Sequence, residues 1–262
     1  MNLERERQLI ERMGARLTVE QDLRDFYAHG EIVSRLAVLV ARALGEDEEF
    51  CEEIGVAGML HDIGKLELAD VIYGHRDDIL AVERSKYVRM HPTLGIDVLR
   101  KEGGYSEEII SFIANHHENC DGTGYPNHLE EDEIPYGARI LRVCDVFSAL
   151  VSNRTYRAAF SVDTAIVEMI EDVREYDMRI FLAFLKVVYG PEFASVKELI
   201  DRALTIEVDE TALVEASAAS ASQAAHADST GEKIHADNAE SGDNAHAKNA
   251  VSDERTHAGD RG

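Results

Sequence analysis

Histidines and aspartates in this chain stand where apolar, helix-like segments end or are interrupted. Two pairs of adjacent ligand-type residues, His61 with Asp62 and His116 with His117, each close such a segment. Burying these polar groups is costly unless they are paired or bound to a metal. Seven residues outside the C-terminal region share such inward or discontinuous positions: His29, His61, Asp62, His91, His116, His117 and Asp145. We therefore expect them to meet around metal ions.

The adjacent pairs indicate more than one ion. Neighbouring residues on a helix point about 100° apart, so neither pair easily binds a single ion as a doublet. Each pair can instead straddle two ions, and the Asp62 carboxylate has one oxygen for each. Two ions about 3.5–4 Å apart generate a hydroxide nucleophile and hold a phosphodiester for in-line attack. Mixed imidazole and carboxylate ligation suits iron, manganese and zinc alike.

Helices must position these residues. Apolar spacing predicts a helix over residues 29–44, with His29 on its inner face, and a second that leads to His61 and is ended by Gly64. Pro92 suits the first turn of a third, and Ser106 caps a helix that continues into His116 and His117. Residues 138–150 and several segments within 161–205 are also helical in pattern. No segment alternates as a strand does, so the predicted fold class is all-α.

Composition limits the partners and the compartment. The 262 residues carry a formal net charge of −24, which argues against nucleic acid polymers and anionic membranes as partners. A small phosphate ligand stays possible, because metals and a few arginines can invert the potential within a cleft. The N-terminus lacks the uninterrupted apolar stretch of a secretory signal, and the three cysteines are widely spaced. We expect a cytoplasmic protein.

The composition also changes near residue 208. The segment 208–262 contains Ala, Ser, Asp, Asn, Gly and His in abundance and no aromatic residue, so we interpret it as a disordered acidic tail. Residues 1–24 are predicted to form a helical lead-in, and residues 25–205 the domain that holds the metal centre.

Five motifs carry a resemblance to a known family. In order and spacing, the chain resembles the HD-GYP family of metal-dependent phosphodiesterases over about residues 25–190. The motifs are HDIGK (61–65), HPTLG (91–95), HHENCDGTGYP (116–126), ARILRVCDVFSAL (138–150) and RTYR (154–157).

The resemblance implies an HD-domain helical bundle with a metal centre in its core. It also implies hydrolysis of cyclic di-GMP to linear pGpG, to GMP or to both, by a metal-bridging hydroxide on two divalent ions, iron first. It assigns His29, His61 and Asp145 to one ion, His91, His116 and His117 to the other, and Asp62 to both. The catalytic residues that it implies are Asp62 and Lys65, with Lys65 contacting the scissile phosphate. The substrate-binding residues that it implies are Lys65, Gly122, Gly124, Tyr125, Pro126, Arg154 and Arg157.

Several positions depart from the family pattern. Asn119 stands where the family usually has arginine, which removes a cation near the site, and Cys120 replaces a large apolar residue. Ala69 and His75 change the segment after HDIGK, so we expect an altered cleft wall. Asp25 stands where members with a third ion carry glutamate, and a solvent-facing acid is the interpretation that we favour.

Alternative functions stay open at this point. The altered wall permits another cyclic dinucleotide or a nucleotide phosphoester as the substrate. The second class of function is a low-turnover module that binds a cyclic dinucleotide and relays its occupancy to a partner. The partners that we consider are a signalling protein or a second copy of the chain in a homodimer.

Overall fold

The structure is a computed structural model that describes residues 2–15, 20–69, 86–153 and 157–205. The chain divides into two compact units, Met1–Thr211 and Ala212–Gly262, and the second lies outside the described residues. The predicted disordered tail also lies outside the described residues, and so do His75 and Arg154, which fall in the gaps 70–85 and 154–156.

Helices form the described part of the chain. The α-helices are α1 (Glu4–Gly14), α2 (Glu20–Leu44), α3 (Glu48–Leu60), α6 (His91–Glu102), α7 (Glu107–Ala114), α8 (Tyr136–Leu150), α9 (Val162–Glu171) and α10 (Met178–Val188). Short 3₁₀ helices are η1 (Ile63–Leu68), η2 (Glu131–Glu133), η3 (Val173–Glu175) and η4 (Pro191–Phe193), and residues 194–205 form a last helix. The described residues contain no strand, and Asp121 and Glu130 form an isolated bridge. The predicted all-α class is confirmed.

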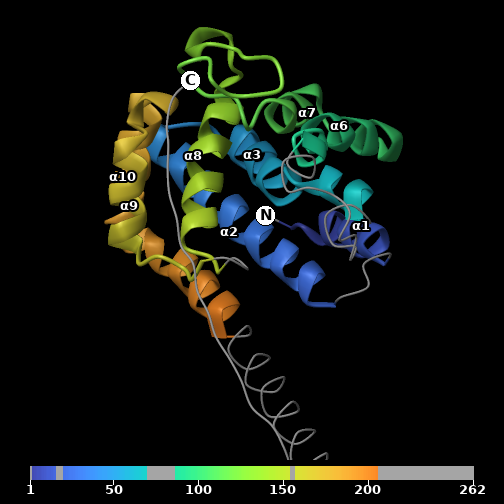
Figure 1. Cartoon of the computed structure of the whole chain (residues 1–262), viewed down its shortest axis with the longest axis horizontal. Helices are drawn as coiled ribbons and strands as arrows, with labels where there is room; N and C mark the ends of the chain where they lie inside the picture. The colour runs from blue at the N-terminus through green and yellow to red at the C-terminus, as the bar shows by residue number, and fades with distance from the viewer. Residues whose placement is uncertain (1, 16–19, 70–85, 154–156, 206–262) are drawn as a thin grey trace, which may run out of the picture. The chain divides into compact units, whose positions relative to one another are not determined.

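The long helix α2 lies at the centre of the first unit. It packs against α3, α8 and α10, and Figure 1 shows α8 between the α9–α10 flank and the α6–α7 side of the bundle. Ile32 and Leu36 of α2 are buried against a core that includes Phe147 of α8 and Phe184 of α10. This packing brings α2 and α8, which are far apart in sequence, side by side. Within the described residues, no helix is long and apolar enough to cross a membrane.

Two helix ends differ from the sequence prediction. α7 ends at Ala114, with Asn115 as its C-cap, so His116 and His117 lie in the following turn and not on the helix. α3 ends at Leu60, before Gly64, and Gly64 lies inside η1. Both metal-type pairs therefore occupy turns just beyond helix ends. There the chain direction is set by the packing of the neighbouring elements as well as by helical periodicity.

The N-terminal helix α1 docks on the bundle. Its Leu9 and Ile10 are buried in the core, and Arg5 donates to the carbonyl oxygens of Gly103 and Gly104 just beyond α6. Cationic groups beside the last carbonyls of a helix are favourable. The domain boundary predicted after residue 24 falls within α2, and the division into lead-in and domain stays a prediction.

Candidate metal centre

Five segments bring the seven predicted ligands together. His29 comes from the middle of α2, the pair His61 and Asp62 from the turn after α3, and His91 from the first position of α6. His116 and His117 follow α7, and Asp145 belongs to α8. Three groups could hold a metal ion: Asp62 with His91, His116 and His117; His29 with His61 and Asp62; and His61 with His116 and Asp145.

The Asp62 carboxylate lies between two sets of histidines. Its Oδ2 is 3.5 Å from Nε2 of His61 and 3.8 Å from Nε2 of His29. Its Oδ1 is 3.2 Å from Nε2 of His91 and 4.0 Å from Nε2 of His116. Each oxygen therefore faces a different set, which is the arrangement needed for one carboxylate to serve two ions.

Contacts within each set are close. Nε2 of His29 lies 3.0 Å from Oδ1 of Asp145 and 3.2 Å from Nε2 of His61. On the other side, Nε2 of His91 lies 3.2 Å from Nε2 of His116. Donor atoms at these separations converge on common points.

Two buried atoms test whether these residues fit a metal. Oδ1 of Asp62 and Nε2 of His117 are buried and have no hydrogen-bond partner in the described part of the chain. Leaving such atoms unsatisfied costs about 1–3 kcal/mol each, and more for a charged group. Metal ions would satisfy both atoms, and imidazole with carboxylate is a suitable donor set for a divalent transition metal. The centre therefore fits metal ions.

Backbone carbonyls orient three of the imidazoles. Nδ1 of His61 lies 2.8 Å from the Gly58 oxygen, Nδ1 of His91 lies 2.6 Å from Val88 and Nδ1 of His116 lies 2.7 Å from Ile113. Donation from Nδ1 leaves Nε2 as the lone-pair atom that faces the centre, as is usual for metal-binding histidines. Each accepting carbonyl is three residues earlier, so the local turn itself fixes the ring.

His29 is oriented by a side chain. Its Nδ1 lies 2.9 Å from Oγ of Ser148, which is fully buried on α8 one turn after Asp145. One turn of α8 therefore supplies both a carboxylate beside Nε2 of His29 and a hydrogen-bond partner for its Nδ1. Sequence analysis missed Ser148, because a small polar residue in an apolar helix has no distinctive pattern.

Burial keeps most of these histidines neutral. It lowers the pKa of His91 to about 4 and that of His117 to about 3, and it holds the pKa values of His29 and His116 below the ordinary range. His61 differs: burial lowers its pKa, but Asp62 and Asp145 outweigh burial and raise it overall. Neutral imidazole is the form that binds metal.

The two aspartates are held ionised. Burial by itself raises the pKa of Asp62, but Lys65 and the histidines more than offset this and bring it well below its usual value. Burial likewise opposes ionisation of Asp145, and His29 and His61 reverse the effect. The carboxylates therefore carry the charge that a cation would neutralise.

Lys65 pairs with the carboxylate at the centre. Its Nζ lies 2.6 Å from Oδ2 of Asp62, and its side chain is one quarter exposed. Close packing of η1 on α6 sets this geometry: a Cβ on Gly64 would lie 2.0 Å from the His91 oxygen and 2.6 Å from the Gly95 nitrogen. Only glycine permits this approach, which brings His61, Asp62 and Lys65 beside His91.

The glycine-rich loop is folded around Glu118. This buried carboxylate accepts from the backbone nitrogens of Asn127 at 2.6 Å and Leu129 at 3.1 Å. A Cβ on Gly124 would lie 2.3 Å from the Asn119 nitrogen, so the loop closes tightly on itself. Gly122 has a φ of +77°, and Pro126 is exposed.

Tyr125 connects this loop to the centre. Its ring stacks on His117, with centroids 4.7 Å apart and planes 20° from parallel. The guanidinium of Arg89, which is exposed, lies over the Tyr125 ring at 5.1 Å from its centroid. Sequence analysis missed Arg89, because it precedes the HPTLG motif and has no spacing of its own.

Arg142 of α8 contacts the side chain of Asn119. Nε of Arg142 donates to Oδ1 of Asn119 at 2.8 Å, and Nη2 pairs with Glu175 at 2.6 Å. A guanidinium thus lies beside residue 119, but it is paired with Glu175, and the expected loss of a cation near the metal centre stays a prediction. Only the tertiary fold brings residue 142 to residue 119.

Other predicted residues have separate environments. Arg157 donates to the carbonyl oxygens of Ala149, Leu150 and Ala158, so its guanidinium caps the end of α8. Ala69 is buried at the end of η1. Asp25 is exposed on α2 and is absent from the groups of described residues that could hold a metal.

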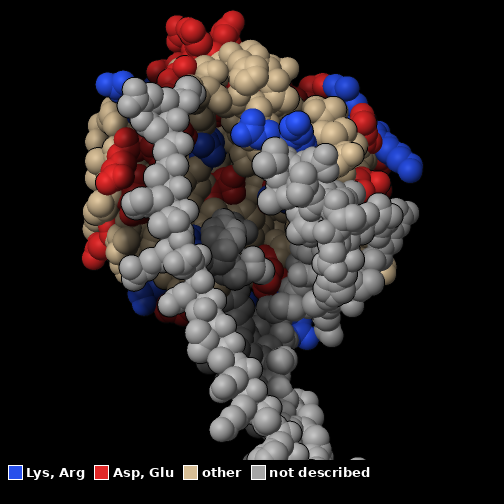
Figure 2. Space-filling view, in the orientation of Figure 1, with Lys and Arg blue, Asp and Glu red and all other residues tan. Residues whose placement is uncertain are grey.

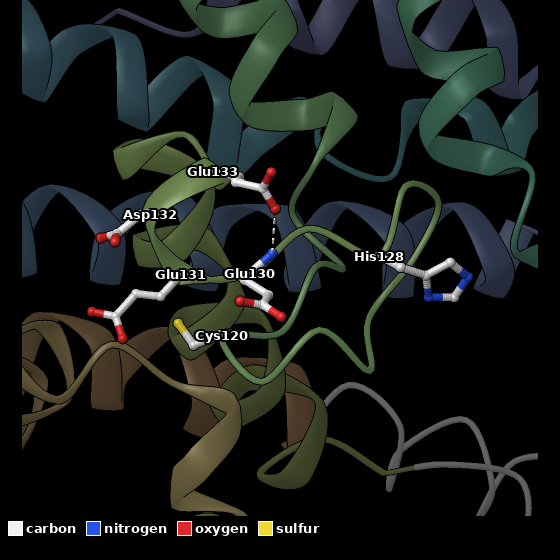
Figure 3. A pocket seen from close by; sticks show the side chains of 6 residues that line it. All are labelled: Cys120, His128, Glu130, Glu131, Asp132 and Glu133. Atoms are coloured by element: carbon white, nitrogen blue, oxygen red, sulfur yellow. Dashed lines mark hydrogen bonds between the residues drawn. The ribbon is translucent and has the colours of Figure 1, made fainter.

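An acidic hollow lies beside the loop but outside the metal centre. Its lining residues are Cys120, His128, Glu130, Glu131, Asp132 and Glu133. In Figure 3, Glu133 points to the backbone of Glu130, from which it accepts at 3.0 Å, and His128 points away from the acids. Burial raises the pKa of the Cys120 thiol to about 12, so the thiol stays protonated. These side chains do not form a metal-binding group.

Acidic and basic side chains share the face that Figure 2 presents. Acidic atoms are visible within a recess, and basic side chains lie beside it. The strongly negative net charge therefore does not exclude local positive potential on this face.

Comparisons with known proteins identify a family and a solved structure of similar fold. A family model for the HD domain matches residues 7–180. The chain belongs to the HD domain family. The solved structure of Bd1817, an HDG"Y"P protein from Bdellovibrio bacteriovorus, is similar in fold, with a TM-score of 0.51, 19% identity and coverage of 69% of this chain and 57% of that one.

Two relatives show the sequence similarity. Cyclic di-GMP phosphodiesterase PA4108 of Pseudomonas aeruginosa is 36% identical over 162 residues, which cover 62% of this chain and 39% of the relative. The 3'3'-cGAMP-specific phosphodiesterase 2 of Vibrio cholerae is 34% identical over 140 residues, which cover 53% of this chain and 27% of the relative. The chain thus spans less than half the length of these relatives. The resemblance to HD-GYP proteins is confirmed.

Proposed function

We propose that this chain is a metal-dependent phosphodiesterase that hydrolyses cyclic di-GMP to linear pGpG, to GMP or to both. The observation that carries the proposal is the Asp62 carboxylate, whose two oxygens face different histidine sets and whose Oδ1 has no hydrogen-bond partner among the described residues. The similarity to PA4108, which is named for this activity, supports the choice of substrate.

The centre is proposed to hold two divalent ions, with iron as the first choice and manganese or zinc as alternatives. One ion is assigned to His29, His61 and Asp145, the other to His91, His116 and His117, and Asp62 serves both. When bound, such ions supply an activated water and neutralise charge on the phosphodiester.

The protein's own groups hold the substrate. Lys65 lies beside Asp62, and this position supports its proposed role of contacting the scissile phosphate. Tyr125 and Arg89 offer a ring and a planar cation at the outer side of His117. Such groups stack on bases and bind phosphate oxygens. Gly122, Gly124 and Pro126 shape this loop, and Arg154 and Arg157 stay proposed ligand-binding residues from the family motif.

The test is hydrolysis of cyclic di-GMP by anaerobically prepared protein whose metal content has been measured. We expect pGpG or GMP as product, and Asp62→Asn should abolish its formation. Asp97→Asn, the same change at an exposed site on α6, should leave the rate unchanged. Failure of metal-loaded wild-type protein to release either product would refute the proposal.

The second candidate substrate is 3'3'-cGAMP, because one relative with 34% identity is named for it. A panel that includes cyclic di-GMP and 3'3'-cGAMP at equal concentrations distinguishes the two. A higher kcat/KM for 3'3'-cGAMP would favour the second candidate while leaving the metal chemistry intact.

A further inference from the structure

Arg142 of α8 contacts two segments, the glycine-rich loop at Asn119 and η3 at Glu175. Its Nε donates to Oδ1 of Asn119 at 2.8 Å, and its Nη2 pairs with Oε2 of Glu175 at 2.6 Å. The side chains of Arg142 and Glu175 are only 17% and 26% exposed. Such charge-assisted contacts, largely out of water, restrain their partners more than exposed pairs do.

Asn119 passes this restraint to the glycine-rich loop. It is 6% exposed, and its Nδ2 donates to Oγ1 of Thr123 at 2.9 Å. Its backbone nitrogen lies against Gly124, where a Cβ would come within 2.3 Å. The backbone nitrogen of Cys120, the next residue, donates to the Glu175 oxygen at 2.9 Å. The start of the loop is thus held from the side of Arg142 and Glu175.

The loop in turn acts on His117. Nδ1 of each of the other four histidines of the centre has a carbonyl or hydroxyl partner, whereas no hydrogen bond fixes the His117 ring among the described residues. Its imidazole instead stacks on Tyr125, whose backbone nitrogen donates to the His117 oxygen at 3.0 Å. The His117 ring also contacts the His91 and His116 rings, and its Nδ1 lies 4.0 Å from Oδ2 of Asp145. Tyr125 is therefore the contact through which the loop can influence its orientation.

We propose that Arg142 is a positioning residue for the metal centre. By holding Asn119 it fixes the loop 118–130, and through Tyr125 it fixes the His117 imidazole. The competing interpretation is that Arg142 acts only through Glu175, which also accepts from the Cys120 amide; in that case Asn119→Ala would leave the loop amides unchanged.

Amide hydrogen exchange in metal-free protein separates the two interpretations. The reporters are three backbone amides: that of Tyr125, which donates to the His117 oxygen, and those of Asn127 and Leu129, which donate to the Glu118 carboxylate. Arg142→Met should lower their protection at least ten-fold and leave the α2 amides unchanged, because the loop opens locally without global unfolding. Arg12→Met, which removes a more exposed arginine–carboxylate pair of 2.7 Å between α1 and α6, is the control and should leave the protection of these three amides unchanged.

Two further variants keep the test decisive. Asn119→Ala should lower the same protection, and combining it with Arg142→Met should add little, because both remove one shared contact. Arg142→Lys should fall between wild type and Arg142→Met, since lysine keeps the charge but not the planar fork. Unchanged protection in Arg142→Met or in Asn119→Ala, or an equal loss in α2, would overturn the proposal.

The effect of Arg142 on the metal centre can be measured separately, as metal affinity. Titration of metal-free protein with Mn²⁺ should show roughly ten-fold weaker binding in Arg142→Met, the range typical for groups that orient metal ligands. A lower kcat with little change in KM is also expected, and this last expectation rests on the proposed function. If wild-type protein hydrolyses no cyclic dinucleotide, the proposed function fails, and exchange and Mn²⁺ binding still decide the role of Arg142.

Discussion

At the scale of single residues, the centre depends on groups that orient the ligands as well as on the ligands themselves. Asp62 faces both histidine sets with different oxygens, and each neighbouring imidazole turns Nε2 inward because Nδ1 is occupied. Three of these orienting bonds use backbone carbonyls, which substitution cannot remove. The hydroxyl of Ser148, beside His29, is therefore the orienting group that mutation can test most directly.

Removing this hydroxyl should weaken metal binding. We expect Ser148→Ala to lower the affinity for Mn²⁺ by about ten- to a hundred-fold, because loss of a group that orients a ligand has effects of this size. Isothermal titration of metal-free protein measures the affinity. Ser152→Ala is the matched control, since Ser152 lies one turn further and donates to the Ser148 carbonyl instead of to a ligand. Equal affinities in wild type and Ser148→Ala would contradict the prediction.

At the scale of elements, the site depends on how closely η1 approaches the start of α6. The two segments meet at Gly64 and Gly95, where backbone lies against backbone. This contact sets the separation between Asp62 and His91. Neither segment could hold both residues by itself, so the packing of two elements determines the distance between ligands.

A methyl group added at Gly64 should destabilise the fold, whereas one added at Gly95 should have little effect on stability. Gly64→Ala places a Cβ 2.0 Å from the His91 oxygen, and we expect a loss of at least about 2 kcal/mol in the free energy of unfolding, with weaker metal binding. Gly95→Ala is the control: its Cβ would lie 3.4 Å from Ile63 and 3.6 Å from the Gly64 nitrogen. Alanine also favours the helix, so its stability should stay within about 1 kcal/mol of wild type. Urea unfolding of both variants measures this, and equal losses would contradict it.

At the scale of the whole molecule, the metal centre links segments that are distant in sequence. Its donors come from α2, the α3–η1 turn, α6, the turn after α7 and α8. An unfolded chain does not present these groups together. Metal binding should therefore stabilise the folded state against unfolding.

The expected size of this stabilisation can be measured by heating. A metal concentration of 100 Kd should add about 2.7 kcal/mol, which corresponds to a rise of roughly 5–10 °C in Tm for a domain of this size. Differential scanning calorimetry with and without Mn²⁺, followed by chelator, measures the shift. Asp62→Asn should lose most of it. A wild-type Tm that does not respond to metal or chelator would argue against a metal centre in this fold.

The sequence by itself determined the all-α class and most helix positions. Apolar spacing is a local property, and α2, α3, α6 and α8 follow it, as does the Ser106 cap, which accepts from the Ile109 nitrogen. The candidate ligands were also predictable, because polar groups at buried helix positions need compensation wherever the chain folds. Their roles as ligands stay predictions.

Only the tertiary structure decided how these groups are arranged. Helical periodicity predicted that His116 and His117 lie on the same helix as Phe112, whereas α7 ends at Ala114 and the pair lies in a turn. Nothing in the sequence pattern indicated that Asn119 has a partner, whereas α8 brings the Arg142 guanidinium to its side chain across 23 residues of sequence. Ser148 reaches His29 in the same way. Local patterns carry information about neighbours along the chain, but contacts between distant segments depend on how helices pack, and that is set by the whole core.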